Sequence, residues 1–442
     1  MKIPPHQRLT LANGVRLILL PRHEVPLIAF EALVRGGGAL DPVRRDGVAA
    51  LTAELLTYGA GSRDAYAFAD AVEGAGGMLD AEAHREAIIM HGQFLAQDRE
   101  LLLELLSDAL QRPHFDAADL DKVRQRRIES IRAAKDSEPQ SLIGTYGRSL
   151  LFGSHPYGKP IGGSETTLAA IRRADVLEAY RDQFGADRLT LVFAGDFDPT
   201  WLQQAVTRAF ASWRPAGVPL VPLTMPERVS GRRVLLIDSP GSEQTYFWIA
   251  NVGVARAYPL RAALDVTNTA FGGSFGSMLM QALRTRTGLT YSAHSSFRRG
   301  SVPGEFAISS FTQTAATRGA LDIALQTLDA LKRDGPAAQA VTSARSYILG
   351  QYPLGFETAS DWAAALAELD LYGLPQSYID QFDPALQRVD DAQVAQVVGT
   401  AFPSSDDLDI VLIGDAAQIR AQVAPLGPLL EHPLAAPEFA LH

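Results

Sequence analysis

The chain contains no cysteine among its 442 residues. This absence excludes disulfides, a thiolate zinc site and a cysteine nucleophile. Long apolar runs are absent as well, so we expect no segment to span a bilayer. Basic residues are not in excess, because 40 Lys and Arg stand against 50 Asp and Glu, for a net charge of −10. A nucleic-acid partner requires a basic face, and this charge balance argues against one.

The composition that remains is typical of a folded, soluble protein: 47% of the residues are hydrophobic and 20% are charged. At this length two or more domains are the ordinary expectation. Residues 1–6 do not resemble a secretory leader. Periplasm and cytoplasm both stay open as compartments, and we slightly favour the periplasm, with a leader already removed.

Two halves of the chain repeat one pattern, in which an apolar run opens the half and another closes it. Pro21 and Pro240 follow the two opening runs and lie 219 positions apart, and Gly195 and Gly414 in the two closing runs are separated by the same distance. The equal offset indicates a tandem duplication. Closely spaced prolines between the halves suit an extended linker. We therefore expect an N-terminal domain over residues 1–214, a linker over 215–228 and a C-terminal domain over 229–442.

Within each half, strand-like and helical segments are segregated. Apolar spacing of three and four predicts helices over residues 47–58, 65–73, 99–110, 117–135, 264–284, 317–332 and 336–349. Strands are predicted over residues 28–34, 87–94, 306–311 and the opening and closing runs. This order favours an α+β fold with two homologous domains, each a mostly antiparallel sheet covered by helices. The same pattern also fits two paralogous domains with a purely structural role.

The most informative motif lies in the second half, where a glycine-rich stretch over residues 271–279 precedes a helical segment that ends at Arg284. The sequence Gly-Leu-Thr-Tyr-Ser over residues 288–292 then enters a strand. Gly288 is expected to end the helix, so that Arg284 and Tyr291 meet as helix end and strand start. The glycines have neither the Gly-Lys-Ser/Thr ending of a P-loop nor the order of a dinucleotide fingerprint, which argues against a nucleotide site.

Together with the helix over residues 47–59, this motif resembles the pitrilysin and mitochondrial-processing-peptidase family of inverzincin metallopeptidases. The resemblance extends from Leu9 to Ile413 and includes the His-Pro-Tyr-Gly turn over residues 155–158. In that family the first helix carries H-x-x-E-H, whose histidines share one zinc while the glutamate activates water. The matching positions in this chain hold Ala50, Ala53 and Glu54.

The third zinc ligand of the family is a glutamate on a later helix. Ser130 matches that position, and a slip of one residue would place Glu129 there. Even with Glu129 and Glu54, two carboxylates without imidazole or thiolate make a poor zinc site. We therefore interpret the metal site as empty and expect no cofactor in this chain.

The other histidines do not suggest a replacement site. His84 and His91 flank a strand-like run, with Glu82 and Glu86 near His84, and their odd spacing predicts that they point to opposite faces. On that prediction they share no metal. We interpret His155 as structural.

What the resemblance implies for the second half concerns substrate. Arg284 and Tyr291 match an arginine and a tyrosine that cross the family's cavity to the zinc half and hold the substrate at the scissile bond. A phenol stabilises a developing oxyanion, and a guanidinium binds a carbonyl oxygen. Gly272, Gly273 and Ser274 match a flexible loop that guides substrate in the family's non-zinc subunits. A surface ion pair for Arg284 and sheet packing for Tyr291 are the structural alternatives.

Two-subunit members of the family place H-x-x-E-H on one chain and the Arg/Tyr pair on the other, and this chain resembles the second kind. The resemblance implies the non-zinc subunit of a heterodimeric zinc metalloendopeptidase, with unfolded peptides as substrates and zinc in a homologous partner. A catalytically silent scaffold, as in respiratory core proteins, is the alternative. An independent hydrolase is a third interpretation, but no serine or cysteine nucleophile signature supports it.

Overall fold

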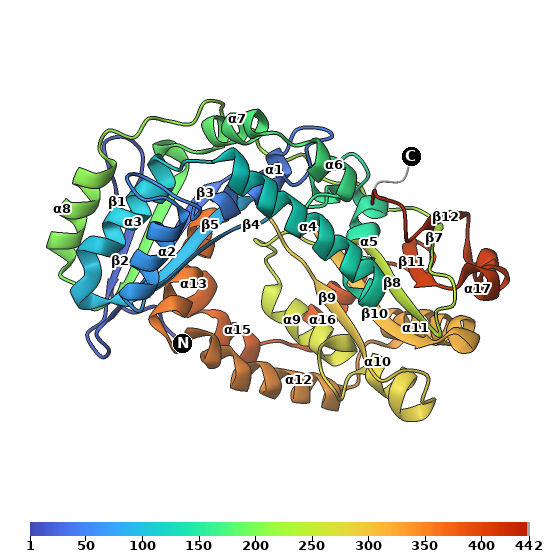
Figure 1. The fold of residues 1–442 in the computed structure, drawn as a ribbon. Coiled ribbons are helices and arrows are strands. Elements are labelled where there is room, and N and C mark those ends of the chain that lie inside the picture. The colour runs from blue at the N-terminus through green and yellow to red at the C-terminus, as the bar shows by residue number, and fades with distance from the viewer. Residues whose placement is uncertain (440–442) are drawn as a thin grey trace.

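A computed structural model describes residues 1–439. Two six-stranded sheets form its framework, one from each half of the chain (Figure 1). The N-terminal sheet has the order β1-β2-β6-β3-β5-β4 and the C-terminal sheet the order β12-β7-β11-β8-β10-β9. The strands of the first are β1 Gln7–Thr10, β2 Arg16–Pro21, β3 Leu27–Arg35, β4 Met78–Ala83, β5 Ala87–Leu95 and β6 Leu189–Gly195. Those of the second are β7 Arg232–Asp238, β8 Gln244–Val252, β9 Ala293–Phe297, β10 Glu305–Gln313, β11 Leu408–Gly414 and β12 Leu429–Pro433.

The duplication read from the sequence is confirmed by the strand order. Five strands of each sheet correspond one to one, since β2-β6-β3-β5-β4 repeats as β7-β11-β8-β10-β9. Most neighbouring strands in each sheet are antiparallel, and the parallel pair β2–β6 of the first half is repeated as the parallel pair β7–β11 of the second. The halves differ at one edge, where β1 pairs antiparallel with β2 and β12 pairs parallel with β7. The fold is α+β, as expected.

Helices cover the sheets. Those of the first half are α1 Val48–Leu55, α2 Ala65–Gly74, α3 Arg99–Gln111, α4 Ala117–Ser137, α5 Ile143–Phe152, α6 Glu165–Ala170, α7 Arg173–Gln183 and α8 Pro199–Phe210. Those of the second are α9 Arg261–Asn268, α10 Met278–Met280, α11 Thr317–Asp334, α12 Ala338–Gln351, α13 Ala359–Leu371, α14 Ser377–Asp380, α15 Phe382–Gln387, α16 Asp391–Thr400 and α17 Ala416–Val423. Among residues 1–439, no helix combines the length and apolar character needed to cross a bilayer.

The two halves exchange one helix each. Helix α13 of the second half packs on β3 and β6 of the first sheet, where Trp362 and Leu366 join Val192 in one apolar cluster. Helix α5 of the first half packs on β8 and β11 of the second sheet, where Tyr146 lies in a cluster with Trp248. Figure 1 shows the orange α13 against the blue strands of the first sheet. The exchange completes the core of each sheet with side chains from the other half.

The exchanged helices occupy equivalent places in the duplication. Leu150 of α5 and Leu369 of α13 are 219 positions apart, the offset of the two halves, and both are buried. Residues 213–230 between the halves form neither helix nor strand. The linker prediction of 215–228 falls within this segment, and the domain boundaries drawn from it stay a prediction.

One helix prediction is wrong. Instead of a continuous helix over residues 264–284, α9 ends at Asn268 and a π-helical turn follows over Thr269–Gly273. After a short loop α10 begins, with the Ser277 side chain accepting a hydrogen bond from Met280 N, and a second π-helical segment covers Gln281–Arg286. Three glycines in this stretch disfavour a regular helix, because glycine loses the most backbone freedom on ordering.

Candidate functional site

Gly47 caps the start of the motif helix α1 in a conformation that favours glycine. Gly47 has φ of 97°, in the left-handed region where other residues are strained. Asp41 accepts hydrogen bonds from the backbone N–H groups of Gly47 at 2.7 Å and Ala49 at 3.0 Å, which fixes the start of the helix. Burial raises the pKa of Asp41 to about 8, despite these two hydrogen bonds.

Guanidinium groups surround the remaining polar side chain of the motif. Ala50 and Ala53 are buried, and the Glu54 carboxylate faces α4. Nε and Nη2 of Arg127 both lie 2.6 Å from Glu54 Oε2, and Arg126 pairs with Oε1 of the same carboxylate. Arg127 Nη2 also donates to the Ala50 carbonyl oxygen at 3.4 Å. Two arginines of α4 thus neutralise the one carboxylate at the motif positions.

The candidates for a third ligand do not approach this carboxylate. Ser130 Oγ donates to the Arg126 carbonyl oxygen at 2.9 Å, and Glu129 Oε1 accepts from Gln125 Nε2 at 3.0 Å. No three His, Cys, Asp or Glu side chains between residues 1 and 439 are grouped so as to hold a metal ion. A zinc site needs several unpaired imidazole, thiolate or carboxylate donors, whereas here methyl groups and a neutralised carboxylate occupy the positions. These residues do not fit zinc.

The prediction that His84 and His91 point to opposite faces is wrong. His84 lies in the turn between β4 and β5, and its N–H donates to the Ala87 carbonyl oxygen at 2.7 Å. It therefore stands opposite Ala87, whose side chain shares a face of β5 with that of His91. Both histidines line the same cavity, and His84 Nε2 lies 3.0 Å from Glu82 Oε1. The spacing rule failed because a turn separates the two residues.

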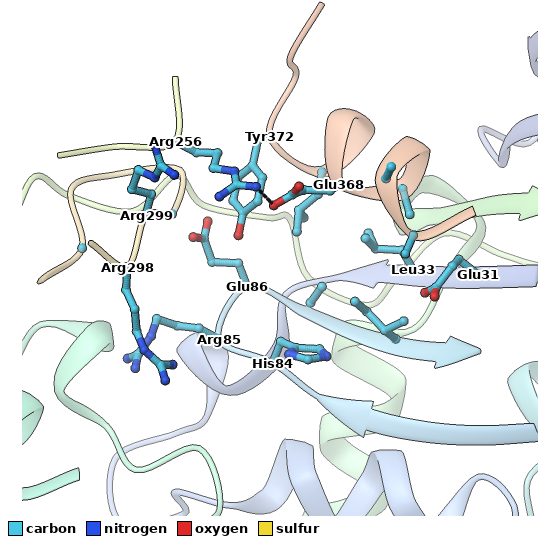
Figure 2. Close-up of a pocket in the computed structure, with 18 of the residues that line it drawn as sticks. Glu31, Leu33, His84, Arg85, Glu86, Arg256, Arg298, Arg299, Glu368 and Tyr372 are labelled. Atoms are coloured by element: carbon cyan, nitrogen blue, oxygen red, sulfur yellow. Dashed lines mark ion pairs between the residues drawn. The ribbon is translucent and has the colours of Figure 1, made fainter. Parts of the chain in front are cut away.

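That cavity, of about 910 Å³, lies between the two halves. Its walls come from the β4–β5 hairpin, from residues 297–305 of the second half and from α13 (Figure 2). Figure 2 shows Arg256 paired with Glu368 at one end and Glu31 on the sheet at the other. Burial raises the pKa of Glu31 to about 8, and the charge of Glu82 adds to the rise.

A hydrogen-bonded junction closes the wall between the halves. Glu86 Oε1 accepts from the Tyr157 hydroxyl at 2.6 Å and from Ser301 N at 2.9 Å. His155 links Tyr157 to the segment between the halves. Its Nδ1 accepts a hydrogen bond from Tyr157 N at 3.1 Å, and its Nε2 lies 2.9 Å from the Thr224 carbonyl oxygen. These contacts give His155 a structural role, as expected. No local sequence pattern signals this cavity, because its walls are far apart in the chain.

Arg284 and Tyr291 lie together at the surface of the second half. The Arg284 Cζ atom is 4.5 Å from the centre of the Tyr291 ring, and 71% of Tyr291 is exposed. Gly288, with φ of 64°, ends the π-helical segment and donates to the Arg284 carbonyl oxygen at 2.9 Å. Strand β9 begins two residues after Tyr291, at Ala293. The chain thus brings the pair together at a helix end and a strand start, while their role with substrate stays a prediction.

The glycine loop before this pair is more closely packed than the sequence suggested. Gly272 is buried, and a Cβ atom there would lie 2.4 Å from Ser295 Oγ and 2.6 Å from Ser295 N. Gly273 is exposed, and Ser274 Oγ donates to the Thr269 carbonyl oxygen at 3.1 Å. Packing against β9 explains Gly272, and peptide contact at Gly272, Gly273 and Ser274 stays a prediction.

Sequence reasoning missed one neighbour of Arg284. The ring centre of Phe275 lies 4.8 Å from Arg284 Cζ, and 68% of Phe275 is exposed. A large aromatic residue within the glycine-rich stretch, between Ser274 and Gly276, could have drawn attention to it. Figure 1 shows that α10, beside this group, and the motif helix α1 lie at opposite sides of the molecule.

The duplicated fold and the altered motif helix define a two-domain chain of the metallopeptidase type whose own metal positions do not fit zinc. The family model named Insulinase (Peptidase family M16) matches residues 26–165, and the model named Peptidase M16 inactive domain matches residues 170–348. The chain belongs to peptidase family M16.

Relatives in several bacteria are similar along most of the chain. A protein of Mycobacterium leprae named uncharacterized zinc protease is 25% identical over 392 residues, covering 88% of this chain and 87% of that protein. The Helicobacter pylori protein named non-peptidase homolog YmxG is 24% identical over 377 residues, covering 84% and 85%.

Solved structures share the fold. The peptidase M16 inactive domain from Pseudomonas fluorescens matches with a TM-score of 0.86 at 24% identity, covering 93% of this chain and 98% of that one. A protease from Helicobacter pylori matches with a TM-score of 0.83 at 16% identity, covering 93% and 100%. At these identities the likeness concerns the fold alone.

Proposed function

We propose that this chain is the non-zinc subunit of a heterodimeric zinc metalloendopeptidase that cleaves unfolded peptides. The observation that carries the proposal is a contrast within one chain. Its metal positions are taken by alanines and by Glu54 paired with arginines, whereas the partly exposed Arg284 lies against the exposed ring of Tyr291. The partner would be a homologous chain that carries H-x-x-E-H and binds the zinc.

The chemistry of this chain's side chains suits that division of labour. Zinc in the partner would polarise the attacking water. The Tyr291 hydroxyl would donate to the oxyanion that develops on the scissile carbonyl, and this hydrogen bond strengthens as negative charge grows. The Arg284 guanidinium would add fixed positive charge and bind a peptide carbonyl oxygen. Neither role requires a metal ligand from this chain.

The names of the relatives are compatible with this proposal. The relative from Mycobacterium leprae is named a zinc protease, and the one from Helicobacter pylori is named a non-peptidase homolog. The family thus includes chains of both descriptions, as a two-subunit enzyme requires. The Pseudomonas fluorescens structure is itself named an inactive domain.

Reconstitution with the zinc-bearing partner tests the proposal. We expect Arg284→Ala and Tyr291→Phe each to lower kcat of the complex by about 10²–10³-fold, the usual loss for one oxyanion donor. Arg333→Ala is the matched control, because Arg333 is an exposed arginine of the same half that pairs with its neighbour Asp334. The chain alone should cleave nothing. Stoichiometric, tightly bound divalent metal in its N-terminal half would contradict the proposal.

A catalytically silent scaffold is the second candidate. The metal positions, which hold alanines and the ion-paired Glu54, are equally compatible with a scaffold when the Arg/Tyr pair is left aside. On that alternative, Arg284→Ala would leave peptide cleavage by the complex unchanged, while loss of the whole chain would still abolish assembly. The two candidates therefore differ in one measured rate.

A further inference from the structure

Phe275 is a large apolar residue that does not contribute to the hydrophobic core. It lies in the loop before α10, with 68% of its surface exposed, and its ring lies 4.8 Å from the Arg284 Cζ atom. Tyr291 contacts the same guanidinium at 4.5 Å and is similarly exposed. Two solvent-exposed aromatic rings therefore converge on one arginine.

The Arg284 side chain contacts both rings. Within residues 1–439 its guanidinium has no hydrogen bond or ion pair, in contrast to the paired Arg126 and Arg127. Contact with aromatic ring faces restrains a planar guanidinium without using its N–H groups, which stay free to bind a carbonyl or carboxylate oxygen. A guanidinium held in this way is ready to accept a ligand.

The loop that carries Phe275 is anchored on both sides. Ser274 Oγ donates to the Thr269 carbonyl oxygen at 3.1 Å, and Ser277 caps α10 through Met280 N. The neighbouring Gly272 packs against Ser295. The exposed ring is thus presented by a fixed backbone at the side of Arg284.

We infer that Phe275 is a positioning residue for the proposed reaction: together with Tyr291 it holds the Arg284 guanidinium so that its N–H groups face the peptide. This inference rests on the proposed function, because the peptide contact belongs to that proposal. The geometric part concerns this chain alone and can be measured without a partner.

The first experiment measures the position of Arg284 in the isolated full chain. With selective ¹⁵N-arginine labelling, and Arg284→Lys to assign the signal, the Arg284 Nε–Hε resonance should be shifted by the two ring currents. Phe275→Leu should move this resonance toward that of a free arginine, whereas Phe275→Tyr should keep it in place. Tyr66→Leu is the control, because Tyr66 is 81% exposed and lies in the other half. A resonance that Phe275→Leu leaves unchanged overturns the inference.

The second experiment measures peptide cleavage by the complex with the zinc-bearing partner. One ring contact at an exposed site corresponds to a loss of about two- to five-fold, so Phe275→Leu should lower kcat by that factor with KM little changed. Phe275→Tyr should restore the rate, and the unfolding midpoint should stay the same in both variants. A general structural defect would instead lower the midpoint and would not be rescued by tyrosine.

The combined results separate this inference from the proposed function. If Arg284→Ala lowers the rate but Phe275→Leu does not, the positioning role is overturned while the proposed function stands. If Arg284→Ala leaves the rate unchanged, the proposed function fails, and the resonance shift still decides whether Phe275 positions Arg284.

Discussion

Glu54 of the motif helix forms ion pairs with two arginines of α4, Arg126 and Arg127. The Glu54 side chain is only 21% exposed, and burial lowers the pKa of Arg127, which shows that this guanidinium is partly desolvated. Removing the carboxylate would leave Arg127 in that environment without its partner. We expect Glu54→Ala to lower the free energy of unfolding by about 1–3 kcal/mol, measured by urea denaturation at pH 7.

An exposed ion pair provides the comparison. Arg420 and Glu431 form a two-bond pair at 2.6 and 2.8 Å at the surface, and Glu431→Ala should cost less than about 1 kcal/mol. A chelator should change neither unfolding curve, because the residues at the motif positions do not fit a metal and the Glu54 ion pairs link α1 to α4. An equal loss in the free energy of unfolding for Glu54→Ala and Glu431→Ala would show that the Glu54 ion pairs stabilise the fold no more than an exposed pair does.

Glu31 gives a prediction about pH at the same scale. Its pKa is about 8 in the folded chain and about 4.3 in an unfolded one. Between these values the folded state binds the extra proton, so the free energy of unfolding must fall as pH rises from about 4.5 to 8. In the original chain we expect the free energy of unfolding to fall by about 2 kcal/mol across this interval, with solvent screening of a half-buried group allowed for. In Glu31→Gln this fall should be absent.

The measurement compares denaturation of the two chains at pH 5 and pH 8. Glu178→Gln serves as the control, because Glu178 is 64% exposed and pairs with Arg181 on the same helix turn. Parallel pH curves for the original chain and Glu31→Gln would contradict the raised pKa.

Among the elements, the segment from α9 to β9 combines close packing with an exposed group. Gly272→Ala would place a methyl group within 2.6 Å of the Ser295 backbone N, so the π-helical turn or β9 must move. We expect a loss of about 1–3 kcal/mol in the free energy of unfolding, as for other insertions into packed positions. The measurement is urea denaturation, with peptide cleavage by the complex as a second readout, since the turn positions the loop before Arg284.

Gly276 is the matched control for this substitution. A Cβ atom at Gly276 would meet nothing within 4 Å, so Gly276→Ala should leave the unfolding curve within about 0.5 kcal/mol of the original. A similar loss in both variants would point to a local backbone conformation that alanine does not tolerate, and not to the contact with Ser295.

The same elements show how far the sequence could lead. Regular periodicity predicted strands such as β5 and helices such as α11 to within about two residues, because one buried face sets the pattern along the whole element. Periodicity failed over residues 264–284, where apolar spacing continues through glycines that break the helix. It also failed at His84, since a turn changes the facing of every later residue.

For the site, the motif spacing led to Arg284 and Tyr291, and the structure places them in contact. Phe275 could not be found by spacing, because its contact with Arg284 depends on how the loop folds back. The arginines at Glu54 were also missed, since α4 lies about 70 residues further along the chain and its register against α1 is a tertiary property.

At the scale of the whole molecule, the exchange of α5 and α13 joins the two halves into one structure. The duplication was visible in the sequence as a repeated offset, but nothing local indicates that each repeat donates a helix to the other sheet. An amphipathic helix encodes an apolar face and not the sheet that receives it. The cavity between the halves is a consequence of this exchange, since α13 forms one of its walls.

Asp370 is the polar anchor of the exchanged helix α13. Its Oδ2 accepts from Thr190 Oγ1 at 2.6 Å and from Arg16 Nε at 2.9 Å, and it lies 3.2 Å from Arg35 Nη2, three residues on three strands of the other half. Burial raises the pKa of Asp370, but the Thr190 hydrogen bond and the two arginines outweigh it and lower the pKa below its usual value. The carboxylate therefore stabilises the fold above about pH 4, and this contribution is lost as pH falls through the lowered pKa.

We expect Asp370→Asn to lower the free energy of unfolding by about 2–4 kcal/mol at neutral pH, because two arginines lose their common partner. Once the pH has fallen through the lowered pKa of Asp370, the variant and the original chain should converge, since the carboxyl group is then protonated in both the folded and unfolded states of the original. Denaturation followed by tryptophan fluorescence is informative, because Trp362 lies on α13 and Trp248 lies under α5. Asp406→Asn, at an exposed pair with Arg232, should change little. If the exchange couples the halves, Asp370→Asn should still unfold in one transition, at a lower denaturant concentration. Two separate transitions would mean that the two sheets, each with the helix from the other half, unfold independently.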